Sequence, residues 1–223
     1  AQIARLRQEN PDILERLRTT FDPPERIEIV LDLSGSMSLP VPGVVPPHSR
    51  LAYVQNELGR YLTALPDRTL VSLRVFGTGA CDPSTLLVPS APLDAAGRTG
   101  LLTRVRNLRP QGATPLARAL REAGASLGSS PGTILLLSDG GDSCEGADAV
   151  CAAAREIAAR SGGHIRVDLV RLFLGPAERA ALMCVPQATG GRLVDLDRPV
   201  DGGLTRSLFD LVPLRVGIAL LVI

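Results

Sequence analysis

Short apolar runs and amphipathic stretches alternate along most of this chain. The apolar runs are rich in Val, Ile and Leu and are bounded by turn residues, which is typical of β-strands. They lie at residues 27–31, 68–76, 86–88, 133–137, 165–174 and 192–196. The amphipathic stretches repeat their apolar residues about every three to four positions, as helices do. They cover residues 51–65, 94–108, 116–127, 147–161, 177–189 and 203–211.

This alternation predicts one α/β domain with a doubly wound, mostly parallel central sheet and helices on both faces. The domain is expected to span residues 26–212, after a helical extension and linker at 1–25. Residues 213–223 are apolar, but such a short run cannot cross a bilayer. They could be an edge strand, the start of a further domain or the start of a truncated membrane helix, and the last two are favoured. Membrane attachment is therefore expected only through missing segments.

The composition narrows the classes of function. Hydrophobic residues make up 45% of the 223 residues, which is enough for a sizeable core, and the net charge is only +1. That charge gives no electrostatic reason to expect nucleic acid as a partner. All 24 basic residues are arginine. Without lysine, the chain has no P-loop nucleotide site and can form no Schiff base.

Four cysteines occur at positions 81, 144, 151 and 184, without a Cys-x-x-Cys pair and with both histidines distant in sequence. This spacing does not favour zinc. Disulfides fit better than four free thiols, so we expect an extracytoplasmic location, with the cytoplasm as the alternative. Two pairings are open: a local Cys144–Cys151 bridge, or Cys81–Cys144 together with Cys151–Cys184. The second is slightly preferred because it uses all four cysteines.

Oxygen-bearing side chains follow two of the predicted strands. Asp32, Ser34 and Ser36 come directly after the first strand, and Asp139 follows the strand at 133–137. Thr114 lies in a tight turn before the helix at 116–127. Because the carboxyl ends of parallel strands meet at one edge of a sheet, these side chains should lie together. Carboxylates and hydroxyls are hard donors that suit Mg²⁺, with Mn²⁺ and Ca²⁺ as alternatives.

These residues resemble the metal-ion-dependent adhesion site of von Willebrand factor A (vWA) domains, whose pattern is Asp-x-Ser-x-Ser, then a Thr, then an Asp. Further segments are similar to bacterial extracytoplasmic vWA proteins: CDPSTLLVP from Cys81, LRPQGATPLARAL from Leu108, LLLSDGGDSC from Leu135, CAAAREIA from Cys151 and CVPQATGGRLVDLD from Cys184. The resemblance implies that Ser34, Ser36 and Thr114 bind the metal directly or through water. It also implies that Asp32 and Asp139 act mostly through water, and that the strand near Leu86 is a short antiparallel edge.

The resemblance implies a non-catalytic protein-binding module whose metal takes a Glu or Asp of a partner. Two alternatives remain: an accessory subunit of an AAA+ machine of the MoxR or chelatase type, and a metal-dependent hydrolase. The hydrolase is disfavoured because such enzymes gather several direct carboxylates and a base near the water, whereas these loops offer mainly hydroxyls. Asp142 and Glu145 follow the site and are interpreted as solvated loop charges rather than as part of the metal rim.

Overall fold

The structure is a computed structural model that describes residues 26–44, 48–174, 180–196 and 203–209. Its elements, in chain order, are β1 (Arg26–Asp32), η1 (Gly35–Ser38), α3 (Arg50–Ala64), β2 (Leu70–Phe76), β3 (Thr85–Pro92), α4 (Ala95–Arg106), α5 (Leu116–Leu127), β4 (Gly132–Ser138), α6 (Ala147–Ser161), β5 (Ile165–Arg171), α8 (Cys184–Thr189), β6 (Leu193–Asp195) and α9 (Gly203–Phe209).

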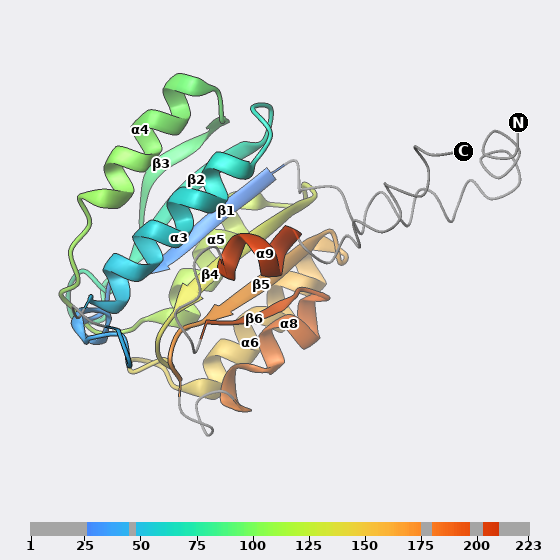
Figure 1. The fold of residues 1–223 in the computed structure, drawn as a ribbon. Helices are drawn as coiled ribbons and strands as arrows, with labels where there is room; N and C mark the ends of the chain where they lie inside the picture. Colours follow the sequence, from blue (N-terminus) through green and yellow to red (C-terminus); the bar gives the residue numbers. More distant parts are fainter. Residues whose placement is uncertain (1–25, 45–47, 175–179, 197–202, 210–223) are drawn as a thin grey trace, which may run out of the picture.

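The strands form one six-stranded sheet in the order β3-β2-β1-β4-β5-β6 (Figure 1). β1 lies in the middle and pairs in parallel with β2 and β4, and the parallel pairing continues through β5 to β6. Of the strands in the described residues, only β3 runs antiparallel, against β2. The predicted fold, with its mostly parallel sheet and antiparallel edge, is confirmed. Because the order reverses beside β1, the carboxyl ends of β1 and β4 border the switch point where such sheets bind ligands.

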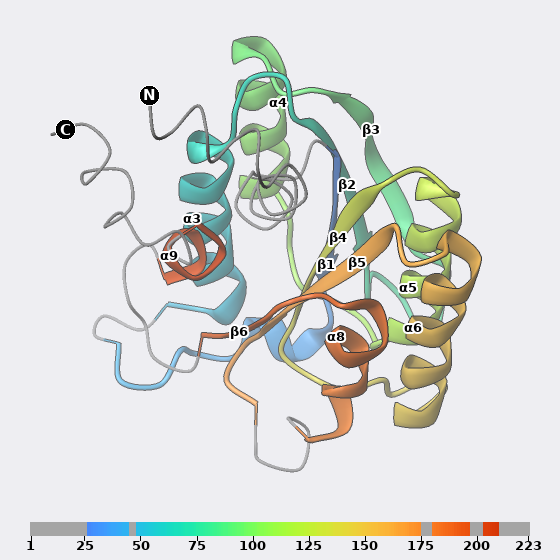
Figure 2. The same cartoon turned by 90° about the vertical axis from the view of Figure 1, so that its right-hand side faces the viewer.

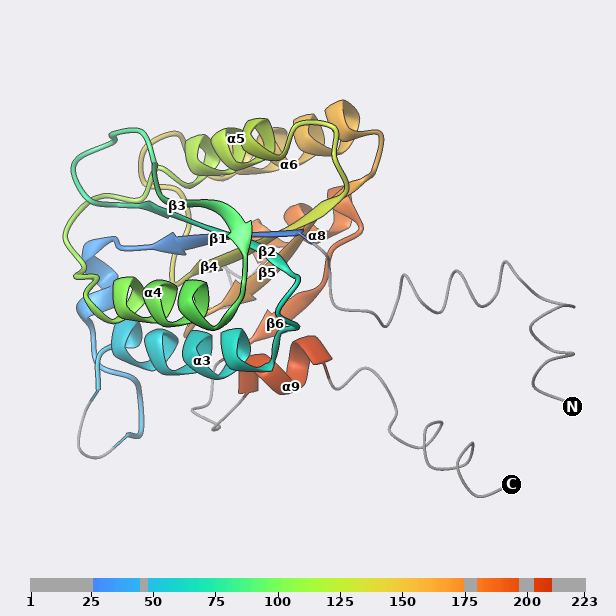
Figure 3. The ribbon, with the colours of Figure 1, turned by 90° about the horizontal axis from the view of Figure 1, so that it is seen from above.

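Helices cover both faces of the sheet (Figures 2 and 3). α3, α4 and α9 pack on one face, where they enclose one hydrophobic cluster with Ile27, Ile29 and Leu31 of β1. α5, α6 and α8 cover the other face around Val30. Successive β1 residues thus point to opposite faces, and both faces are apolar because both are buried. This double burial explains why β1 is apolar apart from Glu28, which is buried as well and pairs with Arg74 at 2.6 Å.

Two elements differ most from the sequence prediction, and β2 and β5 are shorter than expected: β2 begins at Leu70 instead of residue 68, and β5 ends at Arg171 instead of residue 174. The edge strand was expected at residues 86–88 but extends over Thr85–Pro92, with register shifts against β2. Pro89 and Pro92 hid its length, since an edge strand tolerates prolines that a central strand would exclude. Of the helix expected at 177–189, residues 177–179 lie outside the described part of the chain; the remainder is interrupted by a turn at Met183, and α8 begins at Cys184.

The predicted extension at 1–25 and the apolar segment at 213–223 lie outside the described residues, so the domain limits 26–212 stay a prediction. Within the described part of the chain, no helix combines the length and the apolar character needed to cross a membrane.

Two disulfides join segments that are distant in sequence. Cys81, between β2 and β3, is bonded to Cys144, in the loop between β4 and α6. Cys151 of α6 is bonded to Cys184 of α8. The preferred pairing is therefore confirmed, and the local Cys144–Cys151 bridge is wrong. The first disulfide lies on loops at the same end of the sheet as the predicted metal site, while the second fastens two helices on one face.

Candidate metal centre

The candidate site begins where β1 and β4 end side by side. The two strands pair in parallel up to Leu31 and Leu137, so the next residues, Asp32 and Ser138, are neighbours across the sheet. Asp32 is fully buried. One of its oxygens accepts a 2.7 Å hydrogen bond from the backbone N–H of Ser34, and the other accepts a 2.5 Å bond from the Ser138 hydroxyl. Asp32 therefore fixes the turn after β1 and ties it to β4.

Burial makes Asp32 a weaker acid than an ordinary aspartate. Loss of solvation raises the pKa of the Asp32 carboxyl from 3.8 to about 6. The hydrogen bonds from Ser138 and Ser34 act in the opposite direction, and the charge of Asp139 adds to the rise. A carboxylate that is expensive to ionise in isolation is stabilised by a nearby cation. The electrostatics at the end of β1 thus favour a positive charge.

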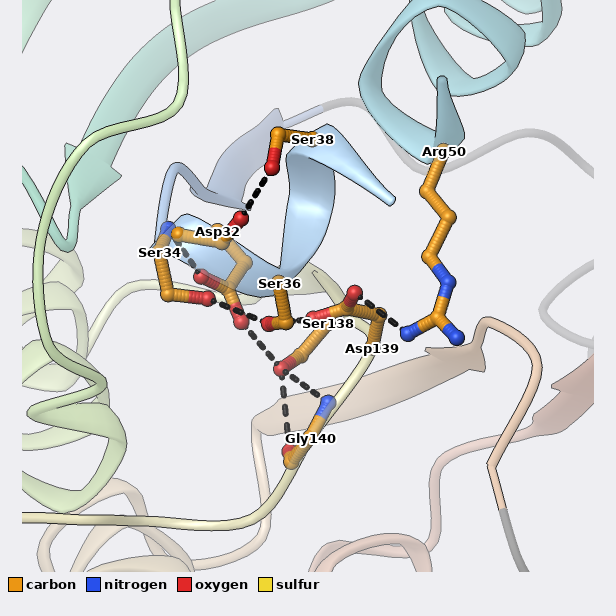
Figure 4. A network of polar contacts seen from close by, with 9 residues as sticks. Asp32, Ser34, Ser36, Ser38, Arg50, Ser138, Asp139 and Gly140 are labelled. Carbon is orange, nitrogen blue, oxygen red and sulfur yellow. Dashed lines mark hydrogen bonds and ion pairs between the residues drawn. The ribbon is translucent and has the colours of Figure 1, made fainter. Parts of the chain in front are cut away.

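A chain of polar contacts extends from Ser34 to Asp139 (Figure 4). The hydroxyl oxygens of Ser34 and Ser36 lie 3.1 Å apart, and the Ser36 hydroxyl donates to Asp139 Oδ1 over 2.7 Å. Together with Asp32, these residues form one cluster at the carboxyl end of the sheet. The structure therefore brings four of the five predicted residues into direct contact through a single network.

Thr114, the fifth predicted residue, is placed beside this cluster by its backbone. Gly35 N–H donates to the carbonyl of Gly112, two residues before Thr114, over 2.9 Å. Ser143 clamps Thr114 from the other side, because its hydroxyl accepts from Thr114 N–H and its own N–H donates to the Thr114 carbonyl. Within the residues that the structure describes, the Thr114 hydroxyl makes no hydrogen bond. It is available to a ligand.

Close backbone packing holds the Thr114 loop against the loop after β2. A Cβ added at Gly112 would lie 2.6 Å from the backbone nitrogen of Gly79 and 2.7 Å from the carbonyl oxygen of Gly77. Gly77 itself has a positive φ of 80° and no room for a side chain beside Ser34. Only glycine fits at these positions. They let the loop after β2 pack closely against the loop after β1 and the Thr114 loop, which carry four of the five predicted ligands.

Sequence reasoning missed two residues of the network. Ser138 directly precedes Asp139, and a hydroxyl at the end of an apolar strand could have indicated it. Arg50 is the first residue of α3, and its Nη1 donates to Asp139 Oδ2 over 2.7 Å (Figure 4). The guanidinium also lies over the ring of Phe173, 5.8 Å from the ring centroid. Nothing in the local sequence around Arg50 points to the site.

Asp142 is a loop organiser rather than a solvated charge. Its Oδ1 accepts backbone hydrogen bonds of 2.7 Å from Cys144 and 2.6 Å from Glu145, and its Oδ2 accepts one of 2.7 Å from Ala117 at the start of α5. Glu145 is exposed and pairs with Arg121 at 2.8 Å. The expectation of a solvated charge was wrong for Asp142, because its carboxylate accepts hydrogen bonds from backbone N–H groups of the loop and of α5.

The donor set fits a hard divalent cation. Oxygens around Mg²⁺, about 2.1 Å from the ion in an octahedron, stand roughly 3 Å apart. The separations of 3.1 Å from Ser34 Oγ to Ser36 Oγ and 2.7 Å from Ser36 Oγ to Asp139 Oδ1 bracket that spacing. Hydroxyls dominate the set, and Asp32 is held by its own hydrogen bonds. The arrangement could therefore hold a cation mainly through neutral oxygens, with the carboxylates of Asp32 and Asp139 close by.

Residues 25–195 match the family model described as the von Willebrand factor type A domain. The uncharacterized protein YwmC of Bacillus subtilis is 27% identical over 143 residues, which are 59% of this chain and 61% of that protein. The chain thus spans about three fifths of the length of this curated relative.

Solved structures share the fold at low sequence identity. The von Willebrand factor type A protein from Catenulispora acidiphila has a TM-score of 0.66 at 19% identity, over 83% of this chain and 41% of that one. The pilus adhesin SpaC from Lactobacillus rhamnosus GG gives 0.64 at 16%, over 83% and 30%. Proximal thread matrix protein 1 from the mussel byssus, with a zinc-occupied MIDAS (metal-ion-dependent adhesion site) motif, gives 0.54 at 14%, over 85% and 45%.

Proposed function

Because this chain belongs to the von Willebrand factor type A domain family, we propose that it is a metal-dependent protein-binding module that acts outside the cytoplasm. The cation is Mg²⁺ by preference, and its binding residues are Asp32, Ser34, Ser36, Thr114 and Asp139. The partner supplies a Glu or Asp side chain to the open position of the metal. Domains of this family commonly mediate protein–protein interaction or adhesion, which is the general ground for the proposal.

The observation that carries the proposal is the convergence of hydroxyl and carboxylate oxygens from three loops at one end of the sheet. Ser34 and Ser36 offer neutral oxygens, and the Thr114 hydroxyl, which has no hydrogen-bond partner among the residues that the structure describes, lies on the adjoining loop. Neutral ligands leave much of the charge of a divalent ion in place. An external carboxylate then gains a charge-assisted contact that the protein's own residues do not satisfy.

Two features support a location outside the cytoplasm. The four cysteines form two disulfides, which are rare in cytosolic proteins. A similar fold occurs in SpaC, which is a pilus adhesin. The AAA+ accessory subunit, as the alternative function, would work in a reducing compartment. Thiol counting on the purified protein with and without reductant separates the two settings.

Metal binding is tested by titration calorimetry with Mg²⁺ on the wild type, Asp32→Ala and a surface control, Asp82→Ala. Asp82 is exposed and lies near the same end of the sheet, beside the disulfide-bonded Cys81. We expect binding by the wild type and the control and none by Asp32→Ala, with the far-UV circular dichroism of all three alike. Unchanged Mg²⁺ binding by Asp32→Ala would refute the assignment.

Partner binding is tested with the same three proteins as bait in an envelope extract, each with Mg²⁺ and with EDTA. A partner that is lost with EDTA and with Asp32→Ala, and that then binds as a purified protein, supports the proposal. Replacing the acidic residues of that partner one at a time should identify the single carboxylate that reaches the metal. A partner retained in both samples would show that binding uses another surface.

A further inference from the structure

We propose that Arg50 is a built-in counter-cation that shares the Asp139 carboxylate with the bound metal and thereby weakens metal binding. This inference rests on the proposed metal function and adds a residue that sets the affinity of the site. It assigns Arg50 a tuning role, because the guanidinium acts on the metal through Asp139.

The two oxygens of Asp139 serve two different partners. Oδ1 accepts from the Ser36 hydroxyl and faces the candidate metal ligands, whereas Oδ2 accepts from Arg50 Nη1, each over 2.7 Å. The Asp139 side chain is 0% exposed, so water does not solvate its charge. A buried carboxylate needs a counter-charge. In the metal-free protein Arg50 supplies it, and a metal on the Oδ1 side would have to share it.

The backbone of Arg50 is fixed to the metal loop itself. Ser49 caps α3 by accepting from Ala52 N–H, and Arg50 N–H donates to the carbonyl of Leu39 over 2.9 Å. Leu39 is the residue that directly follows η1, which carries Ser36. The chain thus leaves the metal loop at Leu39 and returns to it at Arg50. The backbone that carries the Arg50 side chain is therefore held in place by these hydrogen bonds, which direct the guanidinium toward Asp139.

Phe173 forms a platform beneath the guanidinium. The residue follows β5, and its φ of 55° is the only positive value for a non-glycine residue in the described part of the chain. Such a conformation costs free energy and persists only where the surroundings enforce it. Here it presents the ring to Arg50 at 5.8 Å and to Tyr53 at 5.9 Å. A planar guanidinium can stack on this ring and still bond Asp139, which a lysine cannot do equally well.

The consequence is electrostatic. A metal bound at Asp139 Oδ1 would contact a carboxylate that is already paired with Arg50. It would also lie close to the positive charge of the Arg50 guanidinium, which repels it. Both effects lower the affinity for the ion. Replacing Arg50 by a neutral residue should therefore tighten metal binding and, in the absence of metal, leave Asp139 buried without its counter-charge.

The test compares Arg50→Gln with Arg98→Gln, a matched control elsewhere on the domain. Arg98 is 15% exposed against 16% for Arg50, and it pairs with Asp67 at 2.8 Å. Each arginine also keeps one buried guanidinium nitrogen without a hydrogen-bond partner among the described residues. Titration calorimetry should show Mg²⁺ binding at least about tenfold tighter for Arg50→Gln. Arg98→Gln should stay within about twofold of the wild type.

A second readout is thermal unfolding in EDTA and in Mg²⁺. Arg50→Gln should melt below the wild type in EDTA and gain more than the wild type from Mg²⁺, whereas Arg98→Gln should gain the same as the wild type. Arg50→Lys keeps the charge and should bind Mg²⁺ within about threefold of the wild type. If Arg50→Gln does not fold in EDTA, Phe173→Leu replaces it, and removal of the platform should raise Mg²⁺ affinity about threefold.

The possible failures are distinguishable. If the wild type binds Mg²⁺ and the neutral variant binds it equally or more weakly, the role of Arg50 is refuted and the metal site stands. The same holds if Phe173→Leu, used as the substitute, leaves the affinity unchanged. If neither the wild type nor Arg50→Gln binds Mg²⁺, the proposed metal function falls together with this inference.

Discussion

Replacing Asp32 by asparagine should stabilise the metal-free protein at neutral pH and abolish its response to Mg²⁺. The amide can keep both hydrogen bonds, because its oxygen can accept from Ser34 N–H and its nitrogen can donate to the Ser138 hydroxyl. That hydroxyl is then free to donate to the Gly140 carbonyl, which lies 3.0 Å away. The substitution thus removes a buried charge without leaving a buried polar group unpaired.

The magnitude follows from the acidity of Asp32. Burial raises the pKa of Asp32 from 3.8 to about 6, and each pKa unit is worth about 1.4 kcal/mol. The ionised carboxylate therefore destabilises the metal-free fold by about 3 kcal/mol at pH 7. Because the pKa is higher in the folded than in the unfolded protein, this loss is absent below about pH 4 and develops as the pH rises to about 6. Asp32→Asn should accordingly match the wild type at pH 4 and exceed it by up to about 3 kcal/mol at pH 7.

Urea unfolding in EDTA, followed by far-UV circular dichroism, measures both free energies at both pH values. Asp82→Asn is the control, since Asp82 is exposed and its neutralisation should change little at either pH. Mg²⁺ at about 100 times its dissociation constant should add about 2.7 kcal/mol to the wild type and nothing to Asp32→Asn. The reasoning is refuted if Asp32→Asn is less stable than the wild type at pH 7, or if the difference does not depend on pH.

Three further predictions test the loops around the site. Thr114→Val should leave the free energy of unfolding in EDTA within about 0.5 kcal/mol of the wild type, because the Thr114 hydroxyl has no partner among the described residues. The same substitution should weaken Mg²⁺ binding about tenfold in calorimetry, because it removes a proposed ligand. Gly112→Ala should lower the melting temperature and abolish Mg²⁺ binding because its Cβ overlaps the neighbouring loop, while Gly141→Ala, with no atom within 4 Å, should do neither. Replacing Cys81 and Cys144 by alanine should weaken Mg²⁺ binding more than removal of the other disulfide, since only the first bridge joins loops at the metal end; equal effects in calorimetry would contradict this.

The sequence determined the order of the elements and the parallel sheet, because apolar periodicity reflects which faces are buried. It also identified Asp32, Ser34, Ser36, Thr114 and Asp139 as a group, because each follows or borders a predicted strand or helix whose direction fixes its place. The local sequence did not predict the bounds of an element at the solvent-exposed edge of the sheet. Prolines hid the length of the edge strand β3, since an exposed edge tolerates them.

The tertiary structure alone decided what these residues touch. Ser138 bonds Asp32 across 106 positions of sequence, and Arg50 pairs with Asp139 across 89. Both contacts arise because the sheet places β1 beside β4 and the chain from η1 returns to the same end of the sheet. The choice between two disulfide pairings was settled in the same way, by which loops meet. The pattern of apolar residues indicates whether a position is buried. The residue that contacts it is set by the packing of distant segments. The charges around this site depend on such contacts, because Arg50 lies beside Asp139 only in the folded chain.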